Sequence, residues 1–211
     1  MKGTRRALLL SALSLSGLSA CGRQQKLAAL PAGATVLALG DSITYGTGAT
    51  METSYPAMLA KLTGWKVVNA GVPGDTSAGA LARLPGLLQE HSPQLVLVSI
   101  GGNDFLRRLP LAETRANIRA ICEQAAGSGA QVVLVAIPEV TALSAAVRSL
   151  ADHAMYKEVA AELKLPLFAS GWSKVLSDPA LRSDPIHANP QGYEAFARRL
   201  AEWLAEMGVR P

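Results

Sequence analysis

The chain has 211 residues, of which 49% are hydrophobic and 17% charged, and its formal net charge is +4. This length suits a single domain with a substantial core. Three of the 20 basic residues and no acidic residue lie in the first 20 positions, so the remainder carries 17 basic against 16 acidic side chains. A net charge of +1 gives no reason to expect a nucleic-acid partner.

The first 20 residues have the pattern of an export signal. Three basic residues precede an apolar stretch, residues 7–18, which is too short for a membrane-spanning helix of about 20 apolar residues. The stretch ends in Leu18-Ser19-Ala20-Cys21, which resembles the bacterial lipobox. We therefore expect a lipoprotein signal peptide over 1–20, a lipidated N-terminus and tether over 21–31, and one domain over 32–211. Ordinary cleavage near Ala20 is the alternative.

Lipidation of Cys21 would attach the protein to a membrane without a spanning helix, because acyl chains supply about 0.8 kcal/mol per buried methylene. The expected location is then outside the cytoplasm, on the cell membrane or the outer membrane, with the domain facing the periplasm. Gly22, rather than Asp, after the cysteine is compatible with sorting to the outer membrane.

The remainder of the chain alternates between short apolar runs and amphipathic stretches. Expected strands cover residues 34–39, 66–70, 95–100 and 131–137, with a weaker fifth over 166–168. Expected helices cover residues 54–63, 77–91, 111–126, 149–163 and 190–207, the last beginning at Asn189-Pro190. Strands that are apolar throughout are typical of a parallel sheet covered on both faces. The pattern predicts an α/β fold with a doubly wound sheet.

In such a sheet, ligands bind beyond the carboxyl ends of the strands. The segments that follow the first four expected strands are GDSITYG, GVPGDTS, GGNDFLR and IPEVTA, which concentrate Gly, Asn, Asp and Ser at one edge. Ser42 lies directly after the first strand. A serine hydroxyl is a weak nucleophile until a base takes its proton, so Ser42 requires a histidine from elsewhere in the chain.

The chain has three histidines. His91 ends an expected helix at the opposite end of the sheet, and His153 is expected on the surface of an amphipathic helix. His187 lies in a loop before the last helix, three residues after Asp184. A carboxylate at this spacing can accept a hydrogen bond from one ring nitrogen and leave the other facing a serine. Asp184 and His187 are therefore the candidate acid and base.

Two further loops offer hydrogen-bond donors for a developing oxyanion. Gly74 precedes a helix start, so its N–H is expected to be free for a ligand. Asn103 follows two glycines after the third strand, and its side-chain amide is expected at the same edge. Such donors are typically worth about 100- to 1,000-fold in rate. Asp75 and Asp104 are expected to brace these loops or to cap helices.

The blocks ALGDSITYG, VPGDTS, GGND and DPIH, in this order, resemble the SGNH (GDSL) hydrolase family over residues 35–207. The likeness is to the bacterial periplasmic branch of thioesterases, lysophospholipases and arylesterases. It implies Ser42 as nucleophile, Asp184 and His187 as its partners, and the amides of Ser42, Gly74 and Asn103 as the oxyanion hole. It also implies a three-layer αβα sandwich on a five-stranded parallel sheet, without metal or cofactor. The expected substrates are small acyl esters or lysophospholipid-like molecules. The protein is expected to be a monomer.

Two alternatives remain open at this point. The segment Thr47-Gly48-Ala49-Thr50 is similar to the phosphate loop of flavodoxin-like FMN-binding proteins. An O-acetyl-polysaccharide esterase would share the same fold and triad and would differ only in the shape of its pocket. The scarcity of aromatic residues outside helices favours acyl esters over an acetylated glycan. In the family, the segments after Ile137 and Asn103 shape the acyl pocket.

Overall fold

The computed structural model describes residues 26–139 and 149–209. The expected signal peptide, Cys21 and residues 22–25 of the expected tether lie outside the described residues. Five strands form one sheet in which every neighbouring pair is parallel, in the order β2-β1-β3-β4-β5. Their bounds are β1 Thr35–Gly40, β2 Lys66–Gly71, β3 Leu95–Ser99, β4 Gln131–Val135 and β5 Leu167–Phe168. The predicted five-stranded, doubly wound sheet is therefore confirmed.

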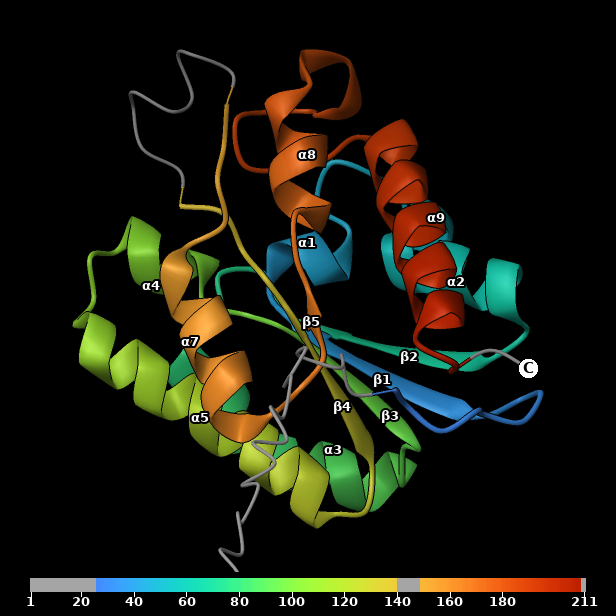
Figure 1. Ribbon diagram of the computed structural model, residues 1–211. Coiled ribbons are helices and arrows are strands. Elements are labelled where there is room, and N and C mark those ends of the chain that lie inside the picture. The colour runs from blue at the N-terminus through green and yellow to red at the C-terminus, as the bar shows by residue number, and fades with distance from the viewer. Residues whose placement is uncertain (1–25, 140–148, 210–211) are drawn as a thin grey trace, which may run out of the picture.

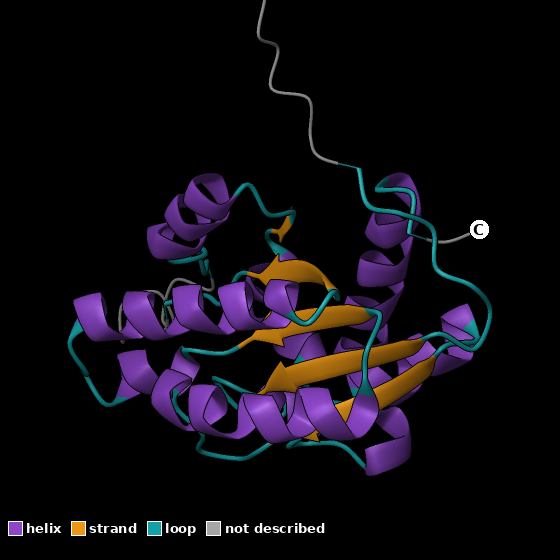
Figure 2. Cartoon of the chain, turned by 90° about the horizontal axis from the view of Figure 1, so that it is seen from below, coloured by secondary structure: helices purple, strands orange, loops and turns teal. Residues whose placement is uncertain are grey.

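Helices cover both faces of this sheet (Figures 1 and 2). Their bounds are α1 Ser42–Tyr45, α2 Tyr55–Thr63, α3 Ser77–His91, α4 Gly102–Leu106, α5 Leu111–Gly127, α7 Ala154–Leu163, α8 Gly171–Ser177 and α9 Pro190–Glu206. Helices α2, α8 and α9 pack together in one layer, and α3, α5 and α7 form the other. Two 3-10 turns, η1 Met51–Thr53 and η2 Pro179–Leu181, complete the described elements. The result is a three-layer αβα sandwich.

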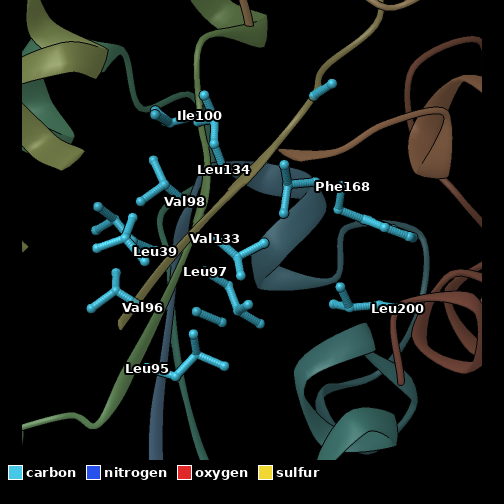
Figure 3. Close-up of a cluster of buried hydrophobic side chains, with 14 of the residues drawn as sticks. Leu39, Leu95, Val96, Leu97, Val98, Ile100, Val133, Leu134, Phe168 and Leu200 are labelled. Carbon is cyan, nitrogen blue, oxygen red and sulfur yellow. The ribbon is translucent and has the colours of Figure 1, made fainter. Parts of the chain in front are cut away.

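The core explains why the central strands are apolar at nearly every position. In β3, Val96 and Val98 point to one side of the sheet and Leu97 to the other, and all three are fully buried (Figure 3). Alternate side chains therefore pack against different helix layers, and neither face reaches water. Burying one such side chain contributes about 1.5–3 kcal/mol, so the central strands anchor the loops that follow them.

Helices α1, α4, α7 and α8 differ from the prediction. The helix expected from residue 149 begins at Ala154, because Asp152 instead forms a β-bridge with Pro138 and His153 acts as the N-cap. The Nδ1 atom of His153 accepts a hydrogen bond from the Met155 N–H at 3.2 Å. The prediction that His153 lies within a surface helix was therefore wrong. Helices α1, α4 and α8 were not predicted, since their four, five and seven residues are too few to show a helical period.

The chain enters the domain at the amino end of the sheet. The Leu27 N–H donates to the carbonyl of Met207, and the Ala28 N–H donates to the side chain of Gln131, the first residue of β4. Over residues 26–139 and 149–209, no helix combines the length and the apolar character that a membrane crossing requires.

Candidate active site

The segment that carries Ser42 makes a tight turn at the carboxyl end of β1. A Cβ on Gly40 would lie 2.5 Å from the carbonyl oxygen of Ser99, so no side chain fits there. Asp41 caps helix α1 by accepting from the Ile43 N–H at 3.1 Å. Ser42 is the first residue of this helix, where the N–H has no acceptor within the helix. The turn therefore presents both the hydroxyl and the N–H of Ser42 beyond the sheet.

The loop that carries His187 is closed by a β-bridge between Arg182 and Ala188. Within it, Asp184 Oδ1 accepts from the N–H groups of Ile186 and His187, both at 2.8 Å. Its other oxygen, Oδ2, lies 2.7 Å from His187 Nδ1. The carboxylate thus fixes both the turn and the imidazole ring. The His187 side chain is 14% exposed.

The loop leads directly into α9, the longest amphipathic helix of its layer. Asn189 caps this helix by accepting from the Gly192 N–H at 2.9 Å, and Pro190 is its first residue. The Asn189 side-chain amide also donates to the carbonyl of Ala180 at 2.8 Å. The rigid helix start, which the sequence predicted, therefore sets the position of the preceding histidine.

The two loops meet although 145 residues separate them in sequence. His187 Nε2 lies 3.0 Å from Ser42 Oγ. The Tyr193 hydroxyl of α9 donates to the Thr47 carbonyl at 2.7 Å, which ties the segment after Ser42 to the start of α9. The structure therefore brings the three predicted residues, Ser42, His187 and Asp184, into one hydrogen-bonded chain.

The pKa of Asp184 decides the direction of these hydrogen bonds. Partial burial raises the pKa, but the hydrogen bonds from the His187 ring and from the Ile186 N–H outweigh it, and the pKa lies below its ordinary value. The carboxylate is therefore ionised near neutral pH and can only accept. It follows that His187 Nδ1 carries the proton, which leaves Nε2 to accept from the Ser42 hydroxyl.

The predicted oxyanion donors lie on the two neighbouring loops. Gly74 has φ of +78°, and its N–H finds no acceptor among the described residues. Asn103 Nδ2 donates to the Asp75 carbonyl at 2.9 Å and to Asp41 Oδ2 at 3.3 Å. Both N–H groups of Asn103 are thus engaged, and the longer bond, to Asp41, is the one that an oxyanion could replace.

Asp104 braces the same region, as expected. Its carboxylate accepts from the N–H and hydroxyl of Ser77 and from the hydroxyl of Thr114, so it joins the starts of α3 and α5 to α4. Asp104 is 1% exposed, and its three polar partners offset the cost of burying a carboxyl group.

Asp41 is a buried group that the sequence reasoning did not single out. Its side chain is 3% exposed. Its pKa is raised to about 7, chiefly by burial: the Ile43 N–H opposes the increase, and the charges of Asp75 and Asp104 contribute to it. No sequence signal marks this burial, because it arises from loops that follow three different strands.

A small, partly open cavity adjoins Ser42 and Asn103. Its lining is mostly apolar and comes from α1, α4, α8, the segment after β4 and the loop of His187. The apolar lining residues are Ile43, Phe105, Leu106, Ile137, Pro138, Leu176 and Ile186. Phe105 also stacks on His153, with ring centroids 4.6 Å apart. Phe105 and Leu106 after Asn103, and Pro138 after Ile137, therefore reach the cavity, whereas residues 140–148 of the second segment lie outside the described residues.

The chain Ser42–His187–Asp184 beside an apolar cavity is the arrangement found in serine hydrolases. The sequence profile of the GDSL-like Lipase/Acylhydrolase family matches residues 38–195. The chain belongs to this family and is a hydrolase of ester bonds. The Thr47–Thr50 segment follows α1 rather than a strand, unlike a flavodoxin phosphate loop.

Individual relatives agree with this membership. "Esterase TesA" of Pseudomonas aeruginosa is 40% identical over 125 residues, which cover 57% of this chain and 62% of that protein. "Thioesterase 1/protease 1/lysophospholipase L1" of Escherichia coli K12 is 35% identical over 175 residues, 82% of each chain. A crystal structure named TesA has a TM-score of 0.73 at 31% identity and covers 82% of this chain and 99% of that one.

Proposed function

We propose that the chain is a serine esterase or thioesterase that works through an acyl-enzyme on Ser42. The observation that carries this proposal is the hydrogen-bonded chain itself, with 3.0 Å between Ser42 Oγ and His187 Nε2 and 2.7 Å between His187 Nδ1 and Asp184 Oδ2. Both distances suit direct proton transfer and orientation without any rearrangement of the loops.

In the first step, Ser42 Oγ attacks the carbonyl carbon of the substrate while His187 Nε2 takes its proton. The carbonyl oxygen becomes an oxyanion that accepts from the N–H groups of Ser42, Gly74 and Asn103. When the tetrahedral intermediate collapses, the bond to the alcohol or thiol breaks, and His187 returns the proton to that leaving group. Asp184 stabilises the imidazolium that exists between these two transfers.

In the second step, water attacks the acyl-enzyme. His187 takes a proton from the water, and the same donors hold the second oxyanion. Collapse breaks the bond to Ser42 Oγ, which regains its proton from His187, and the carboxylic acid leaves. No step requires a metal or an organic cofactor.

The apolar lining of the cavity favours substrates with an apolar acyl group. Such substrates include small aryl esters, acyl thioesters and lysophospholipid-like esters. All seven apolar side chains of the lining are hydrocarbon, and Phe105 is the one aromatic residue among them. An acetylated polysaccharide would be better served by an open shelf with several aromatic rings. We therefore favour acyl esters over O-acetyl glycans.

A chain-length series of p-nitrophenyl esters, run beside acetate release from an acetylated polysaccharide, tests this preference. Leu106 lines the cavity and is 48% exposed, so Leu106→Asp places a charge at its wall without burying it deeply. We expect this variant to lower kcat/KM for the octanoyl ester at least about 10-fold more than for the acetyl ester, since each methylene in an apolar pocket is worth about 1–3 kcal/mol.

Leu109→Asp is the matched control. Leu109 lies three residues further on and is similarly exposed, at 41%, but it does not line the cavity. It should leave the chain-length profile unchanged. Equal effects of the two variants on the profile, or faster turnover of the polysaccharide than of every aryl ester, would contradict the proposed substrate class.

We also propose that Cys21 is lipidated and attaches the enzyme to a membrane as a monomer facing the periplasm. Four residues, 22–25, separate this cysteine from Lys26, and even a fully extended chain from Cys21 to Lys26 would span only about 17 Å. Because the chain enters at the amino end of the sheet, an anchored enzyme would hold its cavity away from the anchoring bilayer. Cys21→Ala should move the protein from the membrane fraction to the soluble fraction, whereas continued membrane association would contradict lipidation.

A further inference from the structure

Arg83 on α3 contacts two of the loops that form the active site, although no step of the reaction uses it. Its Nε atom donates to Asp75 Oδ2 at 2.8 Å, and its Nη2 atom donates to the carbonyl of Gly40 at 2.8 Å. The Arg83 side chain is 24% exposed and that of Asp75 is 12% exposed. This ion pair is therefore largely shielded from water, where its geometry is better defined than in an exposed pair.

The two acceptors are close in sequence to two oxyanion donors. Gly40 stands two residues before Ser42, and Asp75 directly follows Gly74. A guanidinium is a planar fork with fixed directions for its N–H groups. Bonds from one guanidinium to both segments therefore set the distance and orientation between the N–H of Ser42 and that of Gly74.

The third donor is connected through the same aspartate. The carbonyl of Asp75 accepts from Asn103 Nδ2 at 2.9 Å, so a shift of Asp75 displaces the Asn103 amide with it. From the other side, Arg107 Nη2 donates to the carbonyl of Gly74 at 2.7 Å. Arg83 thus stands at the point where the segments of all three donors are joined.

We propose that Arg83 is a positioning residue that holds the Ser42, Gly74 and Asn103 donors in register for the oxyanion. The proposal rests on the hydrolytic mechanism above. Donors aimed at an oxyanion act mainly in the transition state, so misplacing them lowers kcat and leaves ground-state binding nearly unchanged. Arg83 lies outside the cavity lining, which gives a further reason for KM to stay constant.

The test compares Arg83→Met and Arg83→Lys with the wild type, using p-nitrophenyl butyrate and the full mature chain. Arg83→Met should lower kcat by about 10- to 100-fold, less than the typical loss of about 100- to 1,000-fold for a whole donor, with KM within twofold. In Arg83→Lys the charge is kept, but the lysine can reach only one of the two acceptors well. The kcat of this variant should therefore lie between those of the wild type and of Arg83→Met.

Arg115→Met is the matched control. Arg115 also forms an ion pair across two helices, with Glu162 at 3.1 Å, but the pair lies on the surface of α5 and α7. Its kcat should equal that of the wild type. A wild-type kcat in Arg83→Met would overturn the proposal. If Arg83→Met does not fold, as judged by circular dichroism, Arg83→Lys decides: a kcat lowered at least threefold at constant KM supports the proposal, and an unchanged kcat overturns it.

Combining Arg83→Met with Asn103→Ala separates positioning from a general loss of structure. If Arg83 acts partly through Asn103, the double variant should lose clearly less than the product of the two single losses. Fully multiplicative losses would overturn the proposal. The hydrolytic mechanism is tested separately by Ser42→Ala: if that variant stays fully active, the mechanism itself fails, whereas an inactive Ser42→Ala beside a fully active Arg83→Met refutes only the role of Arg83.

Discussion

Because the carboxyl of Asp41 is buried, we expect the free energy of unfolding to fall as the pH rises toward neutrality. Burial raises its pKa from the ordinary value of 3.8 to about 7, with the Ile43 N–H opposing and the charges of Asp75 and Asp104 adding to the increase. The folded protein therefore keeps a proton that the unfolded chain has already released between pH 4 and 7. The contribution of Asp41 to the free energy of unfolding is therefore fully present below about pH 4 and is lost as the pH rises through about 7.

The size of this effect follows from the two pKa values. At about 1.4 kcal/mol for each pH unit, the interval from 3.8 to about 7 amounts to about 4 kcal/mol, of which about 3 kcal/mol falls between pH 5 and pH 8. Asp41→Asn removes the titration. An amide has only one oxygen, so it cannot accept from both the Ile43 N–H and Asn103, and this loss of about 1 kcal/mol applies at every pH.

Urea unfolding of the wild type and of Asp41→Asn at pH 5, 6, 7 and 8, at constant ionic strength, measures this prediction. The free energy of unfolding of the variant, relative to the wild type, should improve by about 3 kcal/mol from pH 5 to pH 8. All other ionisable groups are common to both proteins, so their contributions cancel in the difference. Parallel pH profiles of the two proteins would refute the reasoning.

Two further predictions concern the triad and the oxyanion loop. Asp184→Asn should lower kcat by at least about 100-fold in steady-state assays, because the amide no longer holds the His187 tautomer; a loss below threefold would contradict its role. Gly74→Ala should lower the free energy of unfolding by about 1 kcal/mol, because φ of +78° is strained for alanine, and should also reduce kcat. Unchanged urea unfolding of this variant would show that the turn relaxes freely.

The sheet and the loops around it were predictable from local sequence. β3 is apolar at all its positions but the last, Ser99, because both faces of the sheet are covered, and the helix start at Asn189-Pro190 uses the residues that a cap requires. Since parallel strands end at one edge, the segments that carry Ser42, Gly74 and Asn103 were bound to lie near one another. The loop of His187 was assigned from its position before the last helix, from the spacing of Asp184 and His187, and from the resemblance to a family.

Other features depend on contacts between distant segments and have no local signal. The burial of Asp41, the engagement of both Asn103 N–H groups and the two bonds of Arg83 each join loops that follow different strands. Helix α8, which supplies Leu176 to the cavity, is too short to show a period. His153 was misplaced because a cap and an interior helical residue look alike in an amphipathic stretch.

Covalent labelling can show whether Ser42 is the nucleophile and His187 its base. The protein is treated with a fluorophosphonate and the modified peptide is mapped by mass spectrometry, with Ser42→Ala and His187→Ala treated in parallel. We expect one phosphonate per chain on Ser42, no label in Ser42→Ala and a rate of labelling at least about 100-fold lower in His187→Ala. Stoichiometric label on another residue, or undiminished ester hydrolysis by Ser42→Ala, would contradict these roles.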